Sequence, residues 1–174
     1  MVPRVVSGLG ERWSPSLRLG TGKYTIFNRD RPGQPDYGND YNTYGAYPLY
    51  LTREGQDNFH ITLLRNSNAM DVVLSNHTNS TFLFTYKLIE GVIDFRLFDG
   101  EKDPEAVIKR FHEYSGPSMV SPFWAMGFHQ SRWGYRNAHE LETVLKGYQD
   151  NGIPLDTIWS DIDYMHVRED FTID

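Results

Sequence analysis

Two acidic residues stand at alternate positions near the end of the chain, directly after an apolar segment. Ile158 and Trp159 are typical of the end of a buried strand, and Asp161 and Asp163 follow within the sequence Trp-Ser-Asp-Ile-Asp-Tyr-Met. A strand that ends there places both carboxylates at its carboxyl edge, where the chain turns into solvent. Carboxylates in such a position can accept hydrogen bonds from a ligand or act as an acid and base pair.

The elements before these carboxylates predict a strand–helix–strand unit. Residues 122–128 are an apolar run typical of a strand buried on both faces, with Trp124 expected in the core. Asn137 and Glu140 then begin a helix as a capping box, and apolar residues at helical spacing continue it. Residues 155–162 supply the next strand. The two strands should be parallel neighbours with a right-handed crossover.

The turns after the two strands of such a unit lie on one face, which is where α/β folds build their sites. We therefore expect Arg132 and Trp133, after the first strand, to converge with Asp161 and Asp163, after the second. Aromatic faces beside carboxylates suit a sugar, because its C–H faces stack on indole while its hydroxyls donate to carboxylate oxygens. Two parallel strands do not form a stable sheet alone. Either the unit packs on something unusual or, as we favour, another polypeptide completes its sheet.

Residues 1–99 predict a β-sandwich. From residue 46 to residue 98, short β-type runs alternate with turn-forming segments at the spacing of an antiparallel meander. In the last run, Ile93, Phe95 and Leu97 alternate with charged residues. This alternation predicts that one face of the strand lies on a core and the other in water.

A helix and a domain boundary follow the predicted sandwich. Asp103 and Pro104 are typical of an N-cap and a first helical turn, and a Ser-Gly-Pro sequence ends the apolar stripe that follows them. We expect this helix to lead the chain out of the sandwich. The predicted domains are the sandwich at 1–99, a linker helix within 100–120 and an incomplete α/β region at 121–174.

Residues 7–50 form an aromatic loop region before most of the predicted strands. The region is rich in Gly, Tyr, Asn, Asp and Pro, and it carries more aromatic surface than a flexible linker does. Long loops of this kind tend to be functional. A second interpretation stays open, in which the region is an irregular connection whose tyrosines pack against a sheet.

Composition narrows the class of partner. The 17 basic residues are scattered among 23 acidic ones, and the net charge of −6 argues against a nucleic acid or an anionic membrane as partner. The chain has no cysteine, and its six histidines show no i, i+4 pair with an acidic helper. We therefore expect neither a metal nor another cofactor. No apolar run approaches the roughly 20 residues needed to cross a bilayer.

Two overlapping acceptor sequences for N-linked glycans begin at Asn76 and Asn79. Glycans there would place this segment on an exposed surface of a protein that passes through the secretory pathway. Residues 1–6 lack the uninterrupted apolar core of a signal peptide, so we expect any targeting segment to have been removed or to lie outside these residues. The predicted location is extracellular, lysosomal or vacuolar.

The segments that carry the chemistry resemble glycoside hydrolase family 31, the α-glucosidases and their relatives. Residues 121–135, Ser-Pro-Phe-Trp-Ala-Met-Gly-Phe-His-Gln-Ser-Arg-Trp-Gly-Tyr, and residues 159–165 are similar to the family's first two barrel strands. Upstream pieces match the family's sandwich and linker helix in the same order, at residues 8–11, 27–30, 44–50 and 103–108. The resemblance implies a galactose-mutarotase-like β-sandwich followed by the first β-α-β unit of a (β/α)8 TIM barrel.

This resemblance also implies a substrate and the residues that bind it. The family contains retaining α-glucosidases, which remove terminal non-reducing α-linked glucose from maltose-type oligosaccharides or starch. By position, Asp161 would hydrogen-bond the glucose in the −1 subsite, while Ile162 and Trp133 would line the pocket. A loop at about residues 27–45 would reach over the barrel mouth, where Asp30 would contact the +1 sugar.

Three further residues are expected to support the pocket without touching the sugar. These are His129, Arg132 and Asp163. Asp163 is expected to be a structural acceptor, because the adjacent turn needs hydrogen-bond acceptors. Trp133 stands where the family more often has tyrosine, which bears on substrate preference.

The family mechanism needs two further carboxyl groups, a nucleophile and an acid/base, about 5 Å apart in retaining enzymes. The family's Trp-x-Asp-Met-Asn-Glu type nucleophile motif does not occur here, so we expect no catalytic residue in this chain and assign neither role to Asp161 or Asp163. The chain is expected to be the N-terminal piece of a split or processed enzyme, active only with a second polypeptide that carries the remaining barrel. The alternative is a non-catalytic carbohydrate-binding or interaction subunit.

Overall fold

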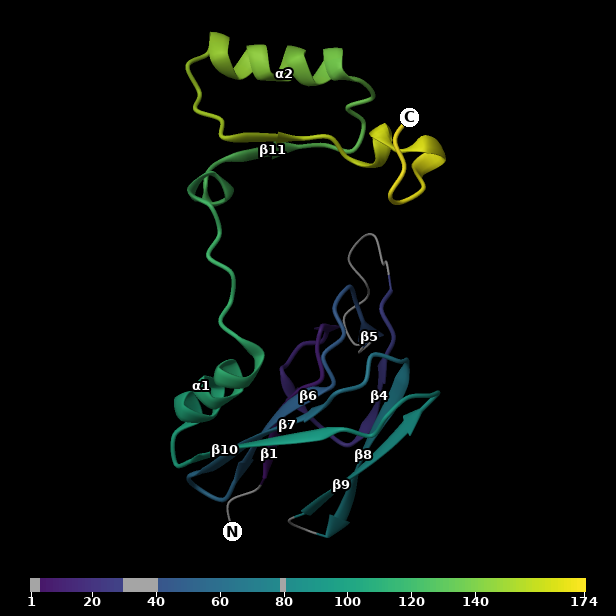
Figure 1. The fold of residues 1–174 in the computed structure, drawn as a ribbon, viewed down its shortest axis with the longest axis vertical. Helices are drawn as coiled ribbons and strands as arrows, with labels where there is room; N and C mark the ends of the chain where they lie inside the picture. Colours follow the sequence, from purple (N-terminus) through teal and green to yellow (C-terminus); the bar gives the residue numbers. More distant parts are fainter. Residues whose placement is uncertain (1–3, 30–40, 79–80) are drawn as a thin grey trace. The chain divides into compact units, whose positions relative to one another are not determined.

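The computed structural model describes residues 4–29, 41–78 and 81–174. The chain divides into two compact units, residues 1–117 and residues 118–174 (Figure 1). Within the described residues, no helix is both long enough and apolar enough to span a membrane.

The first unit contains two antiparallel sheets (Figure 1). The five-stranded sheet has the order β10-β7-β6-β1-β3, from β10 (Phe95–Glu101), β7 (Asn58–Leu64), β6 (Leu49–Glu54), β1 (Val5–Gly8) and β3 (Arg18–Leu19). The three-stranded sheet has the order β4-β8-β9, from β4 (Gly22–Ile26), β8 (Met70–Thr78) and β9 (Thr81–Leu88). The short strands β2 (Arg12–Trp13) and β5 (Tyr41–Asn42) pair with each other.

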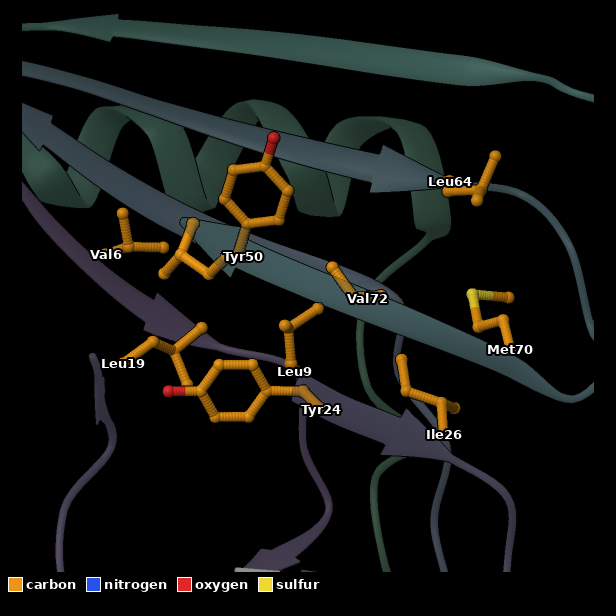
Figure 2. Close-up of a cluster of buried hydrophobic side chains, with 10 residues drawn as sticks. Val6, Leu9, Leu19, Tyr24, Ile26, Tyr50, Leu64, Met70 and Val72 are labelled. Carbon is orange, nitrogen blue, oxygen red and sulfur yellow. The ribbon is translucent and has the colours of Figure 1, made fainter. Parts of the chain in front are cut away.

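The core of this unit lies between the two sheets, as Figure 2 shows. Its apolar side chains come from both sheets: Val6, Leu19, Tyr50 and Leu64 from the five-stranded sheet, Tyr24, Ile26, Met70, Val72 and Leu74 from the three-stranded sheet, and Leu9 from the turn after β1. Tyr50 stacks on Phe84 of β9 with ring centroids 4.3 Å apart. Side chains of two facing sheets that share one core are the arrangement of a β-sandwich, which agrees with the sequence prediction.

The predicted meander is wrong in its connectivity. β6 pairs with β7, but β8 crosses to the other sheet and pairs with β4 and β9, while β10 returns to pair with β7. The crossing follows the turn after β7, where the Asn66 amide donates to the Glu90 and Val92 carbonyl oxygens. These bonds tie the β7–β8 turn to the β9–β10 turn, the two places where the chain passes between the five-stranded and the three-stranded sheet.

The prediction for the apolar face of β10 is also wrong. Ile93 and Leu97 are exposed, Leu97 by 73%, and Phe95 makes only an edge contact with Tyr86. β10 lies at the edge of its sheet, and the core between the sheets takes none of its members from this strand. The opposite parity is the one that packs: Phe98 contacts the next helix.

That helix, α1 (Pro104–Ser115), begins and ends as the sequence predicts. The Asp103 side chain accepts the Glu105 backbone N–H at 2.9 Å, and the Gly116 N–H donates to the His112 carbonyl. Val107 is fully buried against β10, where Gly100 leaves no room for a side chain. α1 therefore belongs to the first compact unit, within residues 1–117.

Asn42 organises the described part of the aromatic loop region. This side chain is 3% exposed, and its Nδ2 donates to the carbonyl oxygens of Glu11 and Gly45 while its Oδ1 accepts the Phe27 N–H. The Glu11 carboxylate in turn accepts the Gly45 N–H. One buried, fully bonded amide thus joins three stretches of backbone. The region is not loop alone, because β3, β4 and the β2–β5 pair lie within residues 7–50. The prediction for Asp30 and the middle of the 27–45 loop lies outside the described residues.

Asp71 gives the first unit a pH-dependent contribution to stability. The Thr25 hydroxyl donates to its carboxylate at 2.6 Å and Lys23 lies 3.5 Å from it, and these two neighbours hold the pKa of Asp71 below its ordinary 3.8. A depressed folded-state pKa contributes stability that is present above the unfolded pKa and is lost as pH falls through the folded one.

We predict that Asp71→Asn destabilises the chain at pH 7, and that its difference from the wild type shrinks as the pH is lowered below about 4. Urea unfolding curves between pH 3 and pH 7 measure this difference. A difference in the free energy of unfolding that does not change with pH would contradict the assignment.

The second unit is a strand–helix–strand arrangement. β11 (His129–Ser131) and β12 (Thr157–Trp159) pair in parallel, and α2 (Ala138–Asp150) connects them (Figure 1). The Asn137 side chain caps α2 by accepting the Glu140 N–H at 3.0 Å, while the Glu140 carboxylate reaches Arg136 N–H instead of the cap residue's own amide. Short 3-10 helices flank the unit: η1 (Phe123–Met126), η2 (Ile162–Tyr164) and η3 (His166–Arg168).

The predicted strand at 122–128 is wrong. Backbone bonds from Ala125 N–H to the Pro122 carbonyl and from Gly127 N–H to the Trp124 carbonyl close a 3-10 turn, and the strand begins only at His129. Trp124, expected in a core, is exposed in this unit. A short apolar run cannot be assigned to strand or helix by periodicity alone, which accounts for the error. The second predicted strand is shorter than expected and ends at Trp159.

Candidate functional site

The two faces of the β11–β12 pair carry different chemistry. On one face, Gln130 is bonded twice: its Oε1 accepts the hydroxyl of Tyr148 of α2 at 2.6 Å, and its Nε2 donates to the Tyr135 hydroxyl at 2.9 Å. Because side chains alternate along a strand, His129 and Ser131 point to the other face, away from the side that binds α2. After β12 the chain continues into the segment that carries the acidic residues.

His129 lies at the centre of an aromatic cluster on this second face. The Trp159 indole N–H donates to His129 Nδ1 at 2.8 Å, and His129 Nε2 lies 3.2 Å from the Trp124 carbonyl oxygen. Nδ1 accepts and Nε2 donates, so this pattern assigns the neutral tautomer with its proton on Nε2. The imidazole is flanked by both indoles, with ring centroids 6.2 Å from Trp124 and 5.7 Å from Trp159. One histidine therefore contacts both Trp124 and Trp159, which are far from each other in the sequence.

The two carboxylates have different surroundings. Asp163 Oδ2 accepts the backbone N–H of Gly134, at 2.8 Å, in the turn after β11. Asp161 begins η2 by accepting the Ile162 N–H at 2.7 Å, and both residues are half-buried. Among the described residues, Asp161 has no other protein partner. Asp163 is thus engaged by the protein, whereas Asp161 retains acceptor capacity for a ligand.

Among the described residues, no hydrogen bond joins any two of the four side chains expected to converge, Arg132, Trp133, Asp161 and Asp163, and their convergence stays a prediction. Asp163 accepts a backbone N–H of the turn after β11. Trp133 is 61% exposed and lies under the Arg168 guanidinium, which is 5.5 Å from its ring centroid. Arg132 is exposed, and within the described part of the chain it makes no hydrogen bond to Asp161.

Asp156 is a structural residue that sequence reasoning missed. Its carboxylate accepts the Phe128 N–H at 2.8 Å, and its own N–H donates to the Phe128 carbonyl at 3.0 Å. A Cβ at Gly127 would collide with this carboxylate, so the chain needs glycine there. The residue lies outside the predicted sites because a single Asp between Leu and Thr has no distinctive sequence pattern.

We predict that Gly127→Ala destabilises the second unit by about 1–3 kcal/mol, because the methyl group displaces Asp156 and breaks its bond to Phe128. Gly147→Ala is the matched control: this glycine lies within α2 with open space around it, so alanine should stabilise by about 1 kcal/mol. Thermal unfolding of both variants measures the difference. Equal effects of the two substitutions would contradict the role assigned to Asp156.

Comparisons with known proteins identify this arrangement. Residues 118–174 match the model of the glycosyl hydrolases family 31 TIM-barrel domain. The chain is 44% identical to a lysosomal acid α-glucosidase of Tetrahymena pyriformis and 39% identical to a probable α/β-glucosidase of Aspergillus clavatus, over 97% and 96% of its length. A crystal structure of a family 31 α-glucosidase from Bacteroides thetaiotaomicron superimposes with a TM-score of 0.73 over 99% of this chain, at 24% identity.

These similar proteins are glycoside hydrolases. The chain belongs to glycoside hydrolase family 31. It spans 18% of the length of each of the two curated relatives and 28% of the bacterial structure.

Proposed function

We propose that these residues form part of a retaining α-glucosidase that removes terminal non-reducing α-linked glucose from maltose-type oligosaccharides or starch. The similarity to α-glucosidases over nearly the whole chain supports this activity. The position of Asp161 supports a sugar-binding site in this chain. Its carboxylate is half-buried, lies just past the end of β12 and has acceptor capacity left for a ligand.

In this proposal the second unit is the first β-α-β unit of the catalytic barrel, and it supplies one wall of the sugar pocket. Asp161 accepts hydroxyls of the glucose in the −1 subsite, while Ile162 and Trp133 line the wall. The exposure of Trp133 supports a contact with a sugar face. Asp30 would contact the +1 sugar from the loop of the first unit.

The reacting carboxyl groups belong, in this proposal, to polypeptide outside these 174 residues, on a second chain or another segment. Retaining glycosidases hold their nucleophile and acid/base about 5 Å apart across the scissile bond. Asp163 is already bonded to Gly134, which suits a structural role better than that of a nucleophile. In this proposal Asp161 binds the sugar and Asp163 binds the protein backbone, so the two carboxylates form part of the substrate-binding site and not the catalytic pair.

Glucose release from maltose by an assembly that contains these residues and the rest of the barrel tests this proposal. We expect hydrolysis with the α-anomer of glucose as first product, since a retaining mechanism preserves the configuration. An assembly that binds maltose without hydrolysing it would favour the alternative, a non-catalytic carbohydrate-binding subunit.

We further propose that the protein is a secretory-pathway glycoprotein with a glycan on Asn76. The relatives include a lysosomal enzyme, and Asn76 is exposed near the end of β8. The second acceptor, Asn79, lies outside the described residues. A mass decrease on treatment with peptide N-glycosidase, reduced or abolished in Asn76→Gln, is the expected result. An unmodified Asn76 in protein isolated from its natural source would contradict it.

A further inference from the structure

Asp161 lies midway between two hydrogen bonds that tie its segment to the preceding strand. Two residues before it, the Trp159 indole donates to His129 Nδ1 at 2.8 Å. Two residues after it, Asp163 Oδ2 accepts the Gly134 N–H at 2.8 Å. Trp159 is the last residue of β12 and Asp163 lies in η2, and both bond the preceding strand or its turn. Among the described residues, the Asp161 side chain between them bonds only the Ile162 N–H, which leaves acceptor capacity for a ligand.

The backbone ladder alone does not fix the direction of Asp161. β11 and β12 pair over three residues each, and the last pair is Ser131 with Trp159. Beyond that pair, the backbone hydrogen bonds of the described residues 160–174 stay within this segment. The Asp161 carboxylate accepts the N–H of Ile162, the next residue of its own segment, so its direction depends on how that segment is held. Side-chain bonds that reach back to the first strand and its turn hold the segment.

The two anchors of these bonds differ in kind. His129 is flanked by the Trp124 and Trp159 rings and bonded at both nitrogens, which fixes its ring plane. The second anchor is a backbone N–H in the turn after β11, where Gly134 adopts a φ of +118° that disfavours any other residue. A fixed anchor such as His129 suits a preorganised binding group, because a carboxylate that must be ordered at the time of binding costs affinity.

We propose that the Trp159–His129 and Asp163–Gly134 bonds are a pair of clamps that hold the Asp161 carboxylate in its sugar-binding direction. His129, Trp159 and Asp163 are then positioning residues for sugar binding. This inference rests on the proposed function, because it requires Asp161 to hold the sugar. It also explains the alternation of functional and structural residues at 159, 161 and 163.

Maltose hydrolysis by the complete enzyme tests the clamps through a double-mutant cycle with Asp161→Ala. Trp159→Phe keeps an aromatic ring but removes the indole N–H, and Asp163→Ala removes the acceptor for Gly134. Each is expected to raise KM by about tenfold with a smaller change in kcat, because a misdirected carboxylate loses binding first. In the Asp161→Ala background, neither should raise KM further, since the clamps act through Asp161.

Conservative variants separate clamping from folding. His129→Asn and Asp163→Asn each keep an acceptor oxygen near the original acceptor atom, so their KM should stay close to the wild-type value. His129→Leu has no acceptor and should raise KM. The Trp159 indole proton, followed by NMR, should be protected from solvent exchange in the wild type and in His129→Asn, and exposed in His129→Leu.

The clamps are overturned if these substitutions raise KM equally with and without Asp161, or if they leave KM unchanged while Asp161→Ala impairs hydrolysis. An unprotected Trp159 indole in the wild type would also overturn them. An Asp161→Ala enzyme with normal activity would reject the proposed function itself, and that result is distinct from failure of the clamps alone.

Discussion

Asp161→Ala is expected to lower kcat/KM for maltose by at least about 100-fold in the complete enzyme. A carboxylate that accepts two sugar hydroxyls makes hydrogen bonds to a charged group, each contributing about 1.5–3 kcal/mol. The combined loss is at least about 3 kcal/mol, and each 1.36 kcal/mol corresponds to tenfold in rate. The loss of a half-buried acceptor at the end of β12 also leaves the sugar hydroxyls unpaired, which adds to the penalty.

Asp150→Ala is the matched control, because it removes an exposed carboxylate at the end of α2. That residue pairs with Lys146 on the helix surface. We expect kcat/KM to change less than twofold, since such pairs are worth about 0.3–0.5 kcal/mol to stability and Asp150 is not part of the proposed site. Steady-state kinetics of both variants give the comparison. Similar losses in the two would show that the effect comes from altered charge or stability and not from sugar binding.

Leu64→Ala is expected to lower the free energy of unfolding of the first unit by about 3 kcal/mol, the usual result of removing a buried leucine side chain. Leu64 is 1% exposed and lies at the end of β7, in the core between the two sheets (Figure 2). Its truncation leaves a cavity that neighbouring β-strands fill only in part.

Leu17→Ala makes the same chemical change at a residue that is 83% exposed, and it should alter stability by no more than about 0.5 kcal/mol. Urea unfolding of the full chain measures both variants. A loss for Leu64→Ala below about 1 kcal/mol would mean that the region between the two sheets does not act as a core.

The sequence predicts local structure well where a specific side chain marks the start of a helix. Asp103 and Asn137 cap the two helices as expected, because their side chains accept backbone N–H groups of the first turn. Hairpins such as β8–β9 follow from alternation and turn residues. These signals are local, so no information about distant parts of the chain is needed to interpret them.

The incorrect predictions involve features that depend on distant partners. The alternation in β10 predicts a buried face, but which face is covered depends on where the other sheet and α1 lie. The apolar run at 122–128 has no periodicity that separates a strand from the 3-10 turn it forms. Where β8 crosses to a second sheet, Asn66 bonds a turn more than twenty residues away, a contact that local alternation does not indicate.

The sequence pattern places Asp161 and Asp163 directly after an apolar strand, but it does not show which of them the protein itself binds. The hydrogen bond from the Gly134 N–H to Asp163 supplies that difference. The bond between Trp159 and His129 joins residues that are thirty positions apart, and its geometry depends on the parallel register of β11 and β12. The tertiary structure therefore shows what the sequence pattern does not, namely which side chains already hydrogen-bond to other parts of the protein.

We propose that Asp161 binds the sugar while the reacting carboxyl groups lie outside these 174 residues. A fluorinated glucosyl fluoride that traps the covalent glycosyl-enzyme intermediate tests it directly, followed by proteolysis and mass spectrometry of the labelled peptide. We expect a label on an Asp or Glu outside these 174 residues, and slower trapping in Asp161→Ala. A label on Asp161 or Asp163 would contradict it.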